Sequence, residues 1–536
     1  MANQISNTNF TPGQIKTIDP NEIDSTLLVD NGDDQKRLRA LITRRHPEYD
    51  ETKVHWEFLE DTYEGGRDWF SDGNIFRYMK EGTVEFSDRL KRAYRFNHTR
   101  EVVDLLNKYL FKQNIVRNMD DAPDSLKDFW NKSTRNGLGI KDFSRQVSKK
   151  ASIYGRVGIV VDNMAGDDDL SKAEAKLRGS KVYAYIVSPE QLLDYSWDEQ
   201  GDLDWILIEE CHRDDEDPFT SSGKEHNRFR LWTKNDWKLF EEQQVGRKKI
   251  VVQIDGAIHG LGEVPVILSD NIITDELYCA PALIDDIAYL DRAVANYLSN
   301  LDAIIQDQTF SQLAMPAQNI LPGEDAYTKL TELGTKRVFL YDAEGHGQPF
   351  FLSPDPKQAQ MILAAINKII NEIYHTVGLA GERTKQDNAL GIDNSSGVAK
   401  AYDFERVNAL LAAKADSLEV FENKLAHLVT LWTGEEDQVV KDLVSYPDNF
   451  DTRGLYDEFD LAARLMLIEA PDVVRQEQMG TLLDKLFPQI GQDRRDKMDA
   501  GIKDWPPVLI LDPTSGQQSL TKTSDKATAK TVLSNN

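Results

Sequence analysis

The chain has 536 residues, more than one compact domain of ordinary size holds, so we expect several domains. Its 90 acidic residues outnumber 63 Lys and Arg, and the net charge of −27 argues against a protein that grips DNA or an anionic membrane over a broad surface. Two cysteines exclude a disulfide framework. The sequence shows neither a signal peptide nor the run of roughly 20 apolar residues that a membrane span needs, so we expect a soluble intracellular protein.

The first half of the chain predicts a polar arm, then helices, then strands. Residues 1–35 are rich in Asn, Asp and Thr, and we expect a flexible arm there. Helical patterns follow to about residue 150, most clearly where Val102, Leu106 and Leu110 recur. From residue 153, β-branched and aromatic runs predict strands at 156–162, 182–187, 205–208, 229–232 and 249–254. These elements predict a mixed α+β domain that closes near residue 267.

Residues 275–313 carry the most informative pattern, because apolar residues recur at a mean step of about 3.7, close to one helical turn. The apolar stripe consists of Leu283, Ile287, Leu290, Val294, Leu298, Leu301 and Ile305. The opposite, polar face carries Asp285, Arg292, Asn296, Ser299 and Gln306. We predict one helix over the whole segment, roughly 58 Å long at 1.5 Å per residue, which Met315 and Pro316 stop. An ordinary core stripe is the alternative, but so long a helix needs neighbours along its length, such as a bundle or a ring of identical helices.

The rest of the chain predicts a small β-rich insert between helices. Strand-like runs at 337–341 and 348–352 precede a second amphipathic helix from about residue 355 to Gly378. Residues 380–397 are polar and Gly-rich and predict a loop, which a long helix over 398–432 follows. A helical region then extends to about residue 503, and the Ser/Thr/Lys-rich end is expected to be disordered.

The sequence contains no motif that identifies a catalytic, cofactor-binding or metal-binding site. The sequence contains no P-loop, no dinucleotide-binding glycine pattern, no nucleophile elbow and no zinc-type spacing of His and Cys. Cys211 beside His212 is a poor metal pair, and Asp167, Asp168 and Asp169 fit a solvated loop better than a calcium loop. We therefore expect no enzymatic activity, no catalytic residues, no cofactor and no metal.

A basic run around residue 95 allows two interpretations. Its members are Arg89, Lys91, Arg92, Arg95 and Arg100. They could bind phosphate, but the exposed face of a helix is the commoner role for such a run, and we favour it.

The order of these elements resembles the portal (connector) proteins of tailed bacteriophages. The resemblance covers about residues 50–500. It rests on the order of several sequence segments rather than on any single motif. Its pieces are 63–66 (YEGG), 89–97 (RLKRAYRFN), 154–162 (YGRVGIVVD), 186–192 (IVSPEQL), 280–290 (APALIDDIAYL) and 314–316 (AMP).

The resemblance implies a multidomain α+β fold with wing, stem, clip and crown regions and long stem helices. In those terms 1–35 would be the N-terminal arm, 36–274 and 397–455 the wing, 275–313 and 354–378 the stem, 314–353 the clip, 379–396 the tunnel loop, 456–505 the crown and 506–536 a disordered tail. It also implies a homo-oligomeric ring, usually of twelve subunits, at one capsid vertex. Double-stranded DNA would be packaged and ejected through this ring, which would bind terminase, a head–tail adaptor and the major capsid or scaffolding protein. The protein would then be found in the virion, and in the host cytoplasm during assembly.

The charges fit such a conduit, because a channel must not hold what passes through it. Residues 275–313 contain seven acids and one base, and we take the polar face of this helix as the candidate channel wall. Arg383 and Lys385 stand out in the predicted tunnel loop as candidates for weak contact with the DNA backbone, although a surface loop with idle charges is an equal alternative. Another structural protein of a virus head, or an enzyme with an unfamiliar site, are the other functions left open.

Overall fold

The computed structural model describes residues 16–17, 32–79, 81–163, 181–215, 217–245, 248–308, 312–316, 339–341, 348–352, 357–379, 397–435, 443–448, 450, 471–486, 492–503, 508–511 and 518–521. The chain divides into two compact units, Met1–Asn449 and Phe450–Asn536, and each is described by itself.

Helices form the first part of the larger unit, as the sequence predicts. They are α1 (Gly32–Ile42), α2 (Tyr49–Glu64), η1 (Phe70–Asn74), α3 (Thr83–Arg92), α4 (His98–Leu110), α5 (Asp124–Asn131) and α6 (Ile140–Tyr154). At the start of α4 the Asn97 side chain accepts a hydrogen bond from the Arg100 amide and so caps the first turn. Val102, Leu106 and Leu110 then bury the face that their spacing predicts.

Two antiparallel sheets follow. Their strands are β3 (Arg156–Asn163), β4 (Val182–Val187), β5 (Leu192–Trp197), β6 (Leu203–Arg213), β7 (Glu225–Thr233), β8 (Asp236–Val245), β9 (Lys248–Ile258) and β10 (Val266–Asp270). The smaller sheet has the order β10-β3-β4, and the larger has the order β1-β9-β8-β7-β6-β5, with β1 (Lys16–Thr17) at its edge. The five predicted strands are confirmed, whereas β5, β8 and β10 were not predicted. A further short antiparallel pair joins β2 (Val116–Arg117) to β14 (Val444–Ser445).

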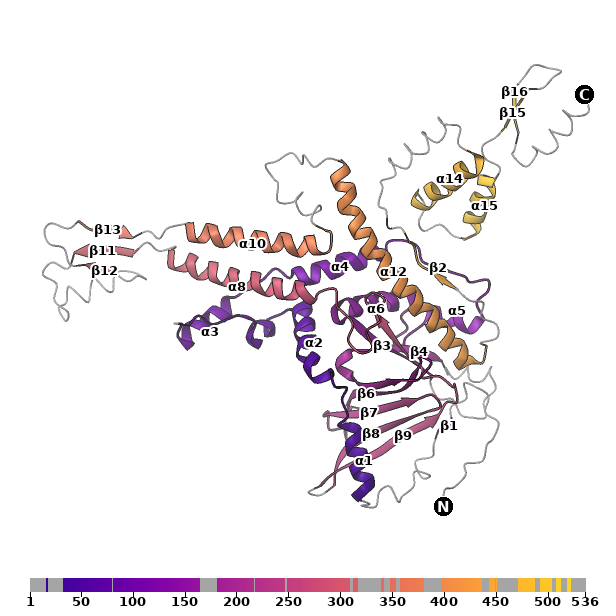
Figure 1. Ribbon diagram of the computed structural model, residues 1–536, viewed down its shortest axis with the longest axis horizontal. Helices are drawn as coiled ribbons and strands as arrows, with labels where there is room; N and C mark the ends of the chain where they lie inside the picture. The colour runs from indigo at the N-terminus through magenta and orange to yellow at the C-terminus, as the bar shows by residue number, and fades with distance from the viewer. Residues whose placement is uncertain are drawn as a thin grey trace, which may run out of the picture. The chain divides into compact units, whose positions relative to one another are not determined.

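The second half of this unit contains a pair of helices with a small sheet beyond their far ends (Figure 1). The helices α8 (Asp285–Gln308) and α10 (Lys357–Thr376) lie side by side, and α12 (Gly397–Thr433) is the longest helix described. The small sheet consists of β11 (Gln312–Pro316), β12 (Phe339–Tyr341) and β13 (Phe350–Leu352), with β11 in the middle. This arrangement confirms a β-rich insert between two amphipathic helices.

The first of the paired helices is shorter than the sequence predicts. The prediction covered 275–313, but α8 has 24 residues and begins at Asp285. The carbonyl groups of Glu276, Leu277 and Tyr278 accept hydrogen bonds from the Arg156 guanidinium at 2.8 to 3.3 Å, so they are not free to form helical bonds. At the other end, the predicted stop at Met315 and Pro316 lies within strand β11.

The next two helices are confirmed close to their predicted limits. Gly378 ends α10 in the left-handed region at φ +76°, and the Leu379 amide donates to the Tyr374 carbonyl, as in a common helix-terminating turn. The helix α12 spans 37 residues, against a prediction of 398–432.

The C-terminal unit contains α14 (Asp472–Leu486), α15 (Gln492–Lys503) and an antiparallel pair of strands, β15 (Val508–Leu511) and β16 (Gln518–Thr521). Within the predicted disordered tail over 506–536, the apolar run of β15 pairs with β16. Likewise, the expected flexible arm over 1–35 includes β1, where Lys16 pairs with Ile258, and the first turn of α1.

Candidate functional site

The apolar stripe of α8 is largely covered within the chain. Leu298 and Leu301 are 5% and 7% exposed, and Ile287 and Val294 are fully buried. Leu283 and Leu290 are half-buried, whereas Ile305, at the end of the stripe, is 49% exposed. The buried face of α10 carries Ile366, Ile370 and Ile373, the pattern expected of a helix packed along a neighbour. One chain thus supplies much of the partner surface that this stripe needs.

The polar face of α8 is covered as well, by residues 67–96, which we call the α3 segment. The Asn296 side chain accepts a hydrogen bond from the Phe76 amide and donates one to the Asn74 carbonyl, both at 2.9 Å. Ser299 is 2% exposed, and its hydroxyl accepts a hydrogen bond of 2.9 Å from Arg89. Asn296 and Ser299 therefore use their polar groups inside the chain rather than on an open wall.

Arg89 is the residue that fastens the α3 segment to α8. It is 3% exposed, and its guanidinium donates to both carboxylate oxygens of Glu81 at 2.8 and 2.7 Å and to the Phe76 carbonyl at 2.8 Å. The hydrogen bond from Arg89 lowers the pKa of the Glu81 carboxyl, so this pair keeps its charges. The exposed helix face that we expected for the basic run is thus wrong for Arg89, although Lys91 and Arg92 are exposed as predicted.

Arg292, the one base of α8, is enclosed by aromatic rings. Its guanidinium carbon lies 4.6 Å from the ring centre of Phe58, 5.0 Å from that of Tyr289 and 5.4 Å from that of Phe76. Such contacts stabilise a cation where water is partly excluded. The charge of Arg292 is therefore directed at aromatic rings of its own chain.

The two remaining members of the predicted polar face lie at opposite ends of α8. Asp285, the first residue of α8, accepts the Ala282 amide at 2.8 Å and lies 2.9 Å from His55 Nε2, so its carboxylate is engaged within the chain. Gln306, near the other end, is exposed and donates to Asp302 at 3.0 Å. Of the five predicted channel-face residues, Gln306 is the one that the structure exposes most.

A buried polar cluster joins α8 and α10 to α4. Asp291 is fully buried, and its carboxylate accepts hydrogen bonds from the Thr99 amide at 3.2 Å and hydroxyl at 2.9 Å. Burial raises the pKa of this carboxyl. Beside it, His98 Nδ1 lies 3.1 Å from the hydroxyl of Tyr374, which donates to Glu101. Asp291 was counted among the acids that would face DNA, and its burial corrects that expectation.

The predicted DNA-contacting bases, Arg383 and Lys385, lie outside the described residues, as does most of the predicted clip between 317 and 338. No side-chain geometry therefore bears on them.

Comparison with known proteins identifies the family of this chain. The family model described as "Phage portal protein, SPP1 Gp6-like" matches residues 46–442, about three quarters of the chain. The protein belongs to this phage portal family. A search of solved structures found "Neck of empty GTA particle computed with C6 symmetry", at 10% identity and a TM-score of 0.37, over 75% of this chain and 89% of that chain. A search of curated proteins gave no match.

Portal proteins are structural proteins, which agrees with the expectation that the chain is not an enzyme. Within the part of the chain that the structure describes, no helix is both long and apolar enough to cross a membrane.

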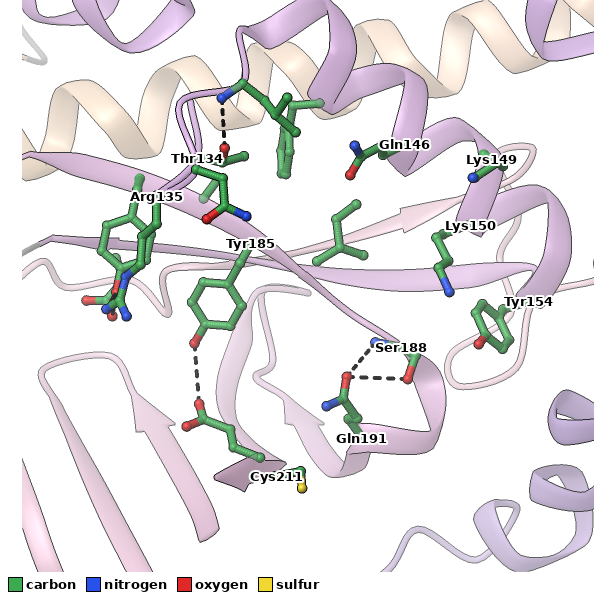
Figure 2. Close-up of a pocket in the computed structure, with 18 of the residues that line it drawn as sticks. Thr134, Arg135, Gln146, Lys149, Lys150, Tyr154, Tyr185, Ser188, Gln191 and Cys211 are labelled. Atoms are coloured by element: carbon green, nitrogen blue, oxygen red, sulfur yellow. Dashed lines mark hydrogen bonds between the residues drawn. The ribbon is translucent and has the colours of Figure 1, made fainter. Parts of the chain in front are cut away.

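This portal protein also contains a pocket of about 760 Å³ between α6 and strands β3, β4 and β6 (Figure 2). Figure 2 shows Lys150 and Tyr154 at one end and Arg135 at the other. Two ion pairs lie within its walls: Lys150 with Glu60 at 2.8 Å, and Arg230 with Glu210 at 2.6 Å.

The pocket's chemistry does not resemble a hydrolytic centre. Its thiol, Cys211, has a raised pKa because of desolvation, the opposite of an activated nucleophile. The Tyr183 hydroxyl donates to Asp162 at 2.7 Å, and burial raises the pKa of that carboxyl. The sequence search did not indicate this pocket, because its residues come from segments up to about 170 positions apart.

Proposed function

We propose that the chain is the subunit of a closed ring at one vertex of a phage capsid, through which double-stranded DNA enters during packaging and leaves during ejection. Family membership over 46–442 is the observation that carries this proposal. The α8–α10 pair with its terminal sheet is consistent with a stem that ends in a clip.

In this proposal the regions keep the limits that the sequence suggests. The wing comprises 36–274 and 397–455, the stem 275–313 and 354–378, the clip 314–353, the tunnel loop 379–396 and the crown 456–505. The clip would bind terminase and later the head–tail adaptor, the wing would contact the major capsid or scaffolding protein, and the usual ring has twelve copies. The protein would assemble in the host cytoplasm and remain in the virion.

The proposed channel wall is revised by the contacts within the chain. Asp285, Arg292, Asn296 and Ser299 are engaged by α2, the α3 segment and the start of α8, so Gln306 is the member of this face that we retain as facing the channel. Asp286 is exposed on α8 and adds negative charge that would repel a duplex. Arg383 and Lys385 remain the proposed points of weak backbone contact.

Head assembly with and without this chain tests the proposal. Heads assembled with the chain are expected to contain nuclease-protected DNA, and heads assembled without it are expected to be empty. Equal amounts of protected DNA in both would contradict a portal role and favour the alternative, another structural role in the head.

A further inference from the structure

The α3 segment carries a run of large apolar side chains that the described part of the chain leaves exposed. Met79 is 103% exposed, Val84 71%, Phe76 55% and Tyr78 40%. We call these four residues the α3 edge. Aromatic residues and Met are enriched where proteins bind one another, and a cluster of them on a surface marks an interaction site.

The α3 edge is held in place rather than loosely attached. The Arg89–Glu81 pair lies directly beneath it, and the Tyr78 hydroxyl donates to Asn300 of α8. Arg89 also lies 4.1 Å from the ring centre of Tyr78, and Arg92 lies 3.6 Å from Asp302. A surface ordered before binding loses little conformational entropy when a partner covers it.

A second exposed apolar surface lies on α10. Met361 is 69% exposed, and Ala364, three residues further on and therefore on the same face of the helix, is exposed as well, so we call these two residues the α10 edge. The sequence between Lys357 and Lys368 carries no charge. An uncharged, apolar helix face fits an apolar partner and offers no counter-ion to a strongly charged one.

The two edges lie on different sides of α8, which runs between α10 and α3 in Figure 1. They also lie at similar heights along it. Tyr374 of α10 and Asp291 of α8 lie at about the same height along the helix pair. His98 contacts Tyr374 and Thr99 contacts Asp291, and His98 and Thr99 are consecutive residues of α4. Met361 is about 13 residues from Tyr374, or roughly 20 Å along α10, and Asn300, which holds Tyr78, is about 9 residues or roughly 14 Å from Asp291 along α8.

The geometry points to contact between the α3 edge of one copy of this chain and the α10 edge of the next copy. The two edges are different surfaces, so the contact is head-to-tail, and repetition of such a contact closes a ring when the rotation between neighbouring copies divides a full turn. Symmetry about a ring axis requires that the surfaces which meet lie at similar heights, as these do. The inference rests on the proposed ring and names the surfaces that build it.

Cysteine cross-linking tests the contact in the full-length chain. In a C211S/C279S background, which removes both native thiols, Met79→Cys and Met361→Cys are made separately and together. Each single variant is expected to stay monomeric on a denaturing gel after treatment with a short bismaleimide. Rings assembled from a mixture of the two single variants are expected to give dimers, and the double variant a ladder of higher multimers.

Phe219→Cys provides the matched control, because Phe219 is 94% exposed in the connection between β6 and β7, away from both edges. Its mixture with Met361→Cys is expected to give no dimer. Closed rings without a product linking positions 79 and 361, or equal yields from the Phe219 control, would overturn the contact and leave the ring intact. Failure of the C211S/C279S parent and of wild type to form rings would instead overturn the proposed ring and this contact with it.

Discussion

Arg89 brings a positive charge into the contact between α3 and α8, where it is 3% exposed and Glu81 is 9% exposed. Taking such a pair out of water is costly, and the pair is retained because both carboxylate oxygens, a carbonyl and the Ser299 hydroxyl accept from the same guanidinium. Arg89 therefore contributes the most buried of the polar contacts that hold the α3 segment on the helix.

Replacement of Arg89 by Met is expected to destabilise the chain, because it leaves the Glu81 carboxylate buried without its partner. Breaking a buried pair costs on the order of 3 kcal/mol, which would lower the Tm by several degrees in a thermal melt. The control is Lys91→Met, which removes one partner of the exposed Lys91–Asp88 pair at 3.1 Å and is expected to leave the Tm almost unchanged. Equal Tm values for the two variants would contradict the fastening role of Arg89.

Lys414 is expected to make the stability of the chain depend on pH. It is 2% exposed in α12, and its Nζ donates to the Ser152 hydroxyl at 2.8 Å and to the Asn271 side-chain oxygen, both uncharged acceptors. Burial lowers the pKa of Lys414 from 10.5 to about 7. Between these two values the folded chain holds this lysine neutral while the unfolded chain protonates it. The unfolded state binds more protons there, so the free energy of unfolding should rise with pH.

Lys414→Met is expected to flatten this rise, as measured by urea denaturation at pH 7 and pH 9. The exposed Lys141 provides the control, and Lys141→Met should keep the wild-type slope. A Lys414→Met variant with the wild-type slope would show that this lysine does not set the pH dependence.

Among the elements, the pairing of α8 and α10 depends on the buried half of the apolar stripe. Leu298→Asp would place a charge at a position that is 5% exposed, whereas Ile305→Asp would do so at one that is 49% exposed on the same stripe. The first is expected to lower the free energy of unfolding by about 3 kcal/mol or more and to weaken rings, while the second should cost much less. Light scattering and thermal melts would detect both effects, and similar losses for the two variants would contradict a packing role for Leu298.

Periodicity made the helices and strands predictable, since α10, α12 and five strands lie where the apolar patterns place them. The start of α8 could not be predicted, because the Arg156 guanidinium, more than 100 residues away, takes up the carbonyls of 276–278. The sequence indicated that α8 has a polar face, but it did not indicate that the α3 segment covers much of this face. Polar side chains that meet another segment look the same in sequence as polar side chains that meet solvent, and Ser299 and Asn296 are examples.

For the whole molecule, the charge distribution connects structure with the proposed passage of DNA. A chain with a net charge of −27 would hold DNA weakly, and Arg383 and Lys385 would supply two bases per subunit within a Gly-rich loop. Arg383→Ala with Lys385→Ala is expected to leave ring formation unchanged and to alter DNA retention in heads, with an effect that shrinks as salt rises. Heads that retain DNA like wild type at low salt would show that these bases have no such role.

The mass of the purified protein tests the ring most directly. Native mass spectrometry of the full chain is expected to show one dominant species with the mass of a closed ring of several copies of the 60.9 kDa chain, which is about 730 kDa for twelve copies. A single species at 60.9 kDa, found at low and high salt and still found when the protein concentration is raised well above that of the first measurement, would contradict the ring.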